Sequence, residues 1–139
     1  MPGERPERPW EERREEIRRY FEEAMGKEPI SVASLERYNP DALEAFYLLR
    51  KATLKEPPEG TLSKKVQELI IIAVEAALKK DPVGHARIAV DAGATPQEIH
   101  DAVGIVLWLA GMPAYHHGMR AVKAAEDYLL EKGSAAAVR

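Results

Sequence analysis

The sequence predicts an all-α protein, and three observations lead to that prediction. Apolar residues recur at helical spacing along most of the chain. Prolines, glycines and capping residues separate these periodic segments at intervals that suit helices. The β-branched residues lie within helical periods, and no two segments are joined by a hairpin turn. We therefore expect a helical bundle without a β-sheet.

The composition is that of one folded domain with a hydrophobic core. Of the 139 residues, 45% are hydrophobic and 31% are charged, and the net charge is −3. Basic residues alternate with acidic ones, which argues against a nucleic-acid partner. No apolar run approaches the ~18 to 20 residues that span a bilayer, and the charged N-terminus is unlike a signal peptide. We expect no membrane partner and a cytoplasmic location.

Residues 1–38 are predicted to form an N-terminal arm and an amphipathic helix. The first eight residues carry two prolines and alternating charges, which is typical of a flexible arm. A helix should follow from about residue 9 to residue 25 and end at Gly26. Its large apolar residues at helical spacing are Trp10, Ile17, Phe21 and Met25.

Residues 39–133 are predicted to form the main helical domain, which begins with two helices. Asn39 supplies an N-cap and Pro40 the first position of a helix that runs to about Lys55. The next helix, from Ser63 to about Lys79, is apolar around most of its circumference. Such a helix usually lies at the centre of a bundle.

Two shorter helices are predicted next. Asp81 is placed to cap the first of them, with Pro82 at its first position, and Gly93 should end it. Thr95 and Glu98 have the spacing of a capping box, which predicts the start of the second.

The last predicted helix follows Gly111 and Pro113 and ends at Gly133, so that residues 134–139 would be a frayed tail. One of its faces carries small residues that permit another helix to approach closely. These are Ala114, Gly118, Ala121 and Ala125.

The chain contains no cysteine. This excludes disulfides, thiolate metal ligands and cysteine nucleophiles together. A redox role would therefore need a bound cofactor, and nothing in the sequence predicts one.

The order of several short motifs resembles that of the carboxymuconolactone decarboxylase family, which includes the alkyl hydroperoxide reductase D-like proteins. The resemblance covers roughly residues 41–130 and implies an alkyl hydroperoxide reductase D-like helical bundle with an N-terminal helical extension. The residues that carry it are Leu62, Ser63, Lys65, Glu68, Leu69 and Ile70, then His85, Ala89, Gly93 and Thr95, then Glu98, Ile99, Gly111, Pro113 and Ala114.

The resemblance also separates two kinds of chemistry. In the peroxidase branch of the family a C-x-x-C pair precedes the histidine, and counting back from His85 places those positions at Leu78 and Asp81. Peroxide reduction by that branch needs a thiolate and a resolving thiol, which this chain lacks. The decarboxylase branch does without cysteines, so the resemblance favours a lyase acting on a small-molecule substrate over a peroxidase.

Glu68 and His85 are the predicted catalytic residues. His85 shares a helical face with apolar residues and should point inward, where it could be a general acid or base or a core histidine bonded to a carbonyl group. Glu68 lies on the one polar stripe of an otherwise apolar helix, together with Glu75. That stripe could line a cavity or face solvent. A short helix connection would permit Glu68 and His85 to meet.

Tyr115 and His117 are the predicted substrate-binding residues. His117 lies at the edge of the apolar face of the last helix, whereas His116 projects on its charged side because adjacent helical residues diverge by about 100°. His100 should be exposed beside Asp101.

Three functions remain open at this point. The preferred one is a cysteine-free lyase of the decarboxylase type, and the alternative is a non-catalytic, oligomeric ligand-binding protein of the same fold. The third is a metal-dependent enzyme that uses Glu68, His85 and His117, although these scattered residues form no sequence motif for a metal.

A homo-oligomer is expected because so small a domain leaves apolar surface uncovered. The resemblance implies a trimer, or a hexamer built from trimers. The aromatic stripe of the first helix, with Trp10, Tyr20 and Phe21, is predicted to dock on a neighbouring subunit; the alternative is that it folds back on its own chain.

Overall fold

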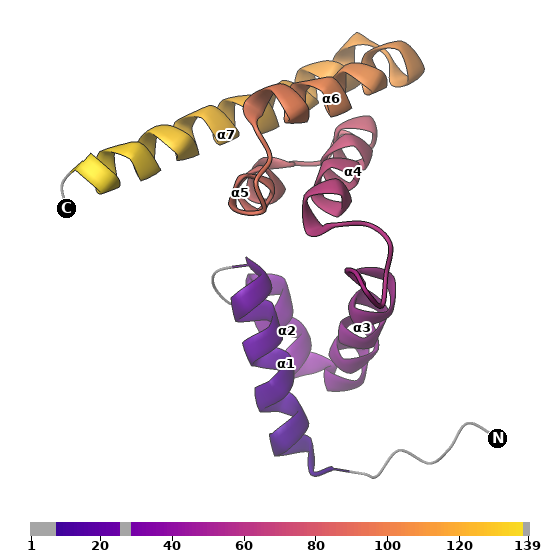
Figure 1. Cartoon of the computed structure of the whole chain (residues 1–139). Coiled ribbons are helices and arrows are strands. Elements are labelled where there is room, and N and C mark those ends of the chain that lie inside the picture. Colours follow the sequence, from indigo (N-terminus) through magenta and orange to yellow (C-terminus); the bar gives the residue numbers. More distant parts are fainter. Residues whose placement is uncertain (1–7, 26–28, 138–139) are drawn as a thin grey trace. The chain divides into compact units, whose positions relative to one another are not determined.

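The computed structural model describes the backbone of residues 8–25 and 29–137 and the side chains up to residue 133. This part of the chain contains seven helices and no strand, which confirms the predicted all-α fold (Figure 1). The helices are α1 (Trp10–Met25), α2 (Ile30–Tyr38), α3 (Pro40–Thr53), α4 (Lys64–Ala77), α5 (Val83–Asp91), α6 (Pro96–Ala110) and α7 (Met112–Ala137).

The helices belong to two compact units, the first ending at Thr53 and the second beginning at Leu54. In the first unit, α1, α2 and α3 enclose a small aromatic core. The ring of Tyr20 meets the rings of Phe21 and Tyr47 edge to face, at 5.1 Å between centroids in each case. The buried members of this core are Ile17, Phe21, Val32, Leu43 and Tyr47.

This core corrects two expectations. The aromatic stripe of α1 was predicted to dock on a neighbouring subunit, but Phe21 is fully buried, and Trp10 and Tyr20 pack against α2 and α3 of the same chain. In addition, no helix was predicted for residues 30–38, whose β-branched Ile30 and Val32 have modest helix propensity. Burial of Val32 in the core outweighs that propensity.

The second unit places α4, α5, α6 and α7 around one core. Helices α6 and α7 lie side by side, and α4 and α5 each pack against α7 (Figure 1). Alanines fill much of the space between them, so the helices approach closely. The buried core residues are Ile72, Ala86, Ala89, Val90, Ala94, Ile99, Val103, Ala121 and Ala125.

Most predicted helix ends in this unit are confirmed. Thr95 Oγ1 accepts a hydrogen bond from the Glu98 amide at 3.1 Å, and Glu98 Oε2 accepts one from the Thr95 amide at 2.9 Å, which is the predicted capping box. Gly93 and Gly111 adopt positive φ angles of 96° and 90°. Asp81 Oδ1 accepts from the Val83 amide at 3.1 Å, so α5 begins one residue later than predicted.

The predicted end of the last helix at Gly133 is wrong, because α7 continues to Ala137. Gly133 is not among the glycines with positive φ, and three alanines follow it, which are the best helix formers. Among the described residues, no helix is both long enough and apolar enough to cross a membrane.

Gly118 sets the distance between α6 and α7. A Cβ atom at this position would lie 2.1 Å from Cγ1 of Val103, which is itself fully buried. At Gly104 on α6, by contrast, an added Cβ would meet no atom within 4 Å. Replacement of either glycine by alanine should raise helix propensity, but only replacement of Gly118 should also create a clash between helices.

We expect Gly118→Ala to be less stable than Gly104→Ala. Overpacking at Gly118 should cost about 1–3 kcal/mol. Both variants share a gain in helix propensity of about 1 kcal/mol, which offsets at most the lower end of that cost. Urea unfolding should show a lower unfolding free energy for Gly118→Ala and a higher one for Gly104→Ala. Equal stabilities of the two variants would contradict the close approach.

Candidate functional site

Glu68 and His85 form a buried carboxylate–imidazole pair between α4 and α5. His85 Nδ1 lies 2.7 Å from Glu68 Oε2. Glu68 is only 5% exposed, and the His85 side chain is 20% exposed. The two predicted catalytic residues are therefore in direct contact.

The connection between α4 and α5 brings the two side chains together. Lys79 adopts a left-handed conformation with φ of 56°, which is unfavourable for a residue with a Cβ atom. The Lys80 amide donates to the Glu75 carbonyl at 2.8 Å, and Asp81 Oδ1 accepts from the Val83 amide in the turn before α5. The chain thus reverses within a few residues, so that α5 packs against α4.

The pair fixes the chemistry of the imidazole ring. An ionised Glu68 accepts the hydrogen bond from Nδ1–H, so the neutral ring carries its lone pair on Nε2. A carboxylate in this position also stabilises the imidazolium that forms when Nε2 takes up a proton. The arrangement suits a general base that becomes a general acid.

Glu75 is a third member of the site. Its Oε1 lies 3.7 Å from His85 Nε2, on the opposite side of the ring from Glu68. Its Oε2 is buried, with no hydrogen-bond partner among the described residues. Burial is the main cause that raises the pKa of Glu75; the charge of His85 acts in the opposite direction, and Asp81 and Glu68 add to the rise.

Glu75 was predicted to lie on the polar stripe of α4 but was not among the predicted catalytic residues. The available signal was spacing, because residue 75 follows Glu68 by two helical turns and so lies on the same face of α4. What the spacing did not reveal is the burial of the carboxyl group.

The predicted substrate-binding residues, Tyr115 and His117, lie on α7 in the second unit. Tyr115 is engaged with His100 between α7 and α6, with 3.0 Å from its hydroxyl to His100 Nε2 and the rings edge to face. The His100 side chain remains 41% exposed, and its Nδ1 lies 3.6 Å from Asp101 Oδ1, as expected from the sequence. His117 Nδ1 is buried and has no hydrogen-bond partner among the described residues. No hydrogen bond or ion pair joins Tyr115 or His117 to the Glu68–His85 pair in this part of the chain.

The metal-dependent alternative gains no support from the geometry. Within the described residues, no group of three or more His, Asp or Glu side chains is arranged to hold a metal ion. The set predicted from Glu68, His85 and His117 is therefore not assembled.

Known proteins share the fold of this chain, and the matched residues include those of the site. The sequence model of the carboxymuconolactone decarboxylase family matches residues 40–124, a range that includes Glu68, Glu75 and His85. A solved structure of a proposed carboxymuconolactone decarboxylase from Burkholderia xenovorans LB400 is 25% identical, with a TM-score of 0.81. The alignment covers 91% of this chain and 98% of that one. No curated protein matches the chain.

We expect Glu75→Gln to change how stability depends on pH. The raised pKa means that the folded protein holds this proton at pH values where the unfolded chain has lost it. Wild-type stability should therefore fall as pH rises from the ordinary glutamate value through the raised folded value. Glu75→Gln should remove that part of the fall, so its stability relative to wild type should increase with pH over this window.

Urea unfolding at a series of pH values from about 4 to 8, which brackets the ordinary glutamate pKa and a raised one, measures this effect. Glu126→Gln, at an exposed position on α7, is the matched control. Parallel profiles for Glu75→Gln and wild type would contradict the assignment.

Proposed function

The chain belongs to the carboxymuconolactone decarboxylase family, and we propose that it is a small-molecule lyase of the decarboxylase type. The substrate class is a small organic acid, lactone or related carbonyl compound. The observation that carries this proposal is the 2.7 Å contact between Glu68 and His85. The absence of cysteine excludes the thiol-based peroxidase chemistry of related proteins.

The proposed step is a decarboxylation completed by proton transfer. The bond between the carboxylate and the neighbouring carbon breaks, carbon dioxide leaves, and the electron pair passes into a conjugated carbonyl group. A proton must then reach carbon. His85 Nε2 supplies it as the imidazolium, while Glu68 holds Nδ1 and stabilises the positive ring.

Glu75 supports the same step as a proton reserve. A carboxyl group whose pKa is raised by burial retains its proton closer to neutral pH. Its Oε1 is 3.7 Å from Nε2, so a small side-chain movement brings it within hydrogen-bond distance of the ring. Glu75 can then return a proton to His85 after turnover.

We expect His85→Gln to lower kcat by about 10²–10⁴-fold, the usual contribution of general acid–base catalysis. Glutamine keeps a side-chain donor toward Glu68, so the melting temperature should change little. Carboxylated lactones, carboxymuconolactone included, are the substrates to assay, by release of carbon dioxide and by incorporation of solvent deuterium at carbon.

His100→Gln is the matched control, because His100 bonds Tyr115 rather than the Glu68–His85 pair. Wild-type turnover in His85→Gln would remove His85 from the mechanism. Saturable binding of these compounds without any turnover by the folded wild type would instead favour the non-catalytic ligand-binding alternative.

We also propose that the chain forms a homo-oligomer, a trimer or a hexamer. Its support is the apolar surface at the end of α6 and the start of α7, where Trp108 is 77% exposed. A monomer rarely leaves so large a contiguous apolar patch in water. The exposed residues of this patch are Ile105, Trp108, Leu109 and Met112.

Light scattering should therefore give a mass that is a multiple of 15.5 kDa. Trp108→Asp should lower the mass toward that of one chain, because a charge at an apolar interface is costly. Ile30→Asp, at an isolated exposed position on α2, should leave it unchanged. A wild-type mass near 15.5 kDa would mean that the proposal is wrong.

A further inference from the structure

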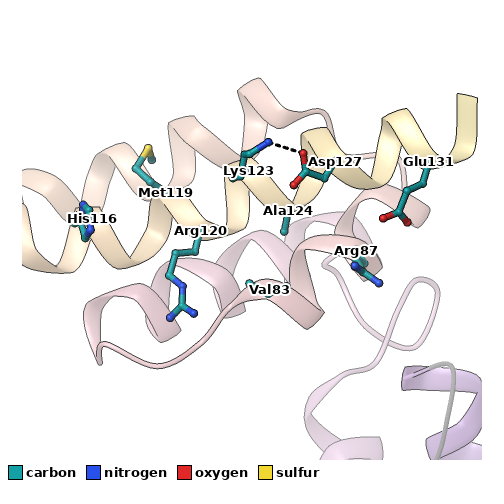
Figure 2. A pocket seen from close by; sticks show the side chains of 9 residues that line it. All are labelled: Val83, Arg87, His116, Met119, Arg120, Lys123, Ala124, Asp127 and Glu131. Atoms are coloured by element: carbon teal, nitrogen blue, oxygen red, sulfur yellow. Dashed lines mark hydrogen bonds and ion pairs between the residues drawn. The ribbon is translucent and has the colours of Figure 1, made fainter. Parts of the chain in front are cut away.

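An open groove of ≈ 510 Å³ lies along the outer side of α5 and α7 (Figure 2). That volume lies within the usual range of small-molecule sites, about 300–1,000 Å³. Both helices belong to the second unit, and their close packing rests on small core residues. The groove is lined by Val83, Arg87, His116, Met119, Arg120, Lys123, Ala124, Asp127 and Glu131.

The lining combines an apolar strip with charged residues that are distributed unevenly between the two ends of the groove. Val83, Met119 and Ala124 are partly buried. Lys123 Nζ lies 2.6 Å from Asp127 Oδ1, so these two charges offset each other. Figure 2 shows His116 and Arg120 toward one end of the groove and Glu131 toward the other.

The guanidinium groups of Arg87 and Arg120, the two arginines of the groove, make few hydrogen bonds within the described part of the chain. Arg120 Nη2 is 3.9 Å from Asp81 Oδ2, which is beyond hydrogen-bond distance, and both side chains are more than half exposed. The guanidinium of Arg87 lies 5.7 Å from the centre of the Tyr128 ring, and no described carboxylate is within ion-pair distance of it. Guanidinium groups in such a state match a carboxylate in both charge and geometry.

We propose that this groove binds a small organic monocarboxylate with an apolar body. The carboxylate lies at the end that holds Arg120 and His116, and the apolar body covers Val83 and Ala124. Toward the other end, Figure 2 shows both Arg87 and Glu131, and their opposite charges leave that end less favourable for a second carboxylate.

This site is separate from the Glu68–His85 pair. Val83 and Arg87 are four residues apart and share one face of α5, whereas His85 is two residues from each and lies on nearly the opposite face. A ligand in the groove would therefore contact α5 from the side that does not carry the imidazole of His85. The inference stands whether or not the proposed lyase activity is found.

Benzoate is the probe that tests the proposal, with the ring protons of His116 as the reporter in NMR titrations of the full chain. We expect a saturable shift with a dissociation constant on the order of 1 mM, as suits so small a ligand. Benzamide, which lacks the charge, and acetate, which lacks the apolar body, should each bind at least about 10-fold more weakly.

Arg120→Gln should weaken benzoate binding about 10-fold or more, and Arg120→Lys should weaken it less because the charge remains. Arg19→Gln removes the same charge from an exposed position in the first unit and should have no effect. Benzoate that shifts His85 instead of His116, or that binds Arg120→Gln as tightly as wild type, would overturn the proposal. So would equal binding of benzamide and benzoate.

Discussion

A buried carboxylate requires a partner, and this requirement governs the second unit. Glu68 is almost fully buried on α4, where an isolated charge would be costly. Hydrogen bonds to charged groups contribute about 1.5–3 kcal/mol, so the contact with His85 offsets much of that cost. In the connection that follows α4, Lys79 is at positive φ, and the amides of Lys79 and Lys80 donate to the carbonyl groups of Ala76 and Glu75, which ends the helix.

The connection between α4 and α5 is also shaped by residues at the ends of the two helices. Leu78 is the C-cap of α4, and Asp81 accepts the hydrogen bond that begins α5. Both residues thus act on the helix ends that border the contacts of His85 with Glu68 and Glu75.

Small core residues let α5, α6 and α7 pack closely together, so that both sides of α5 border other parts of the second unit. The alanines of α5 and α7 bring these helices together, and Gly118 does the same for α6 and α7. One side of α5 places His85 against Glu68 of α4. The other side places Val83 and Arg87 in the lining of the groove. The contact between His85 and Glu68 and the lining of the groove are therefore on different sides of one short helix.

The sequence by itself determined the fold class, the capping box at Thr95 and the stops at Gly93 and Gly111, because each depends on neighbours within a few residues or on helical spacing. Only the tertiary structure decided the rest. Helix α2 forms because Val32 is buried by α1 and α3, and the aromatic stripe of α1 is covered for the same reason. The burial of Glu75 and the engagement of Tyr115 with His100 arise from contacts between helices, which no local pattern encodes.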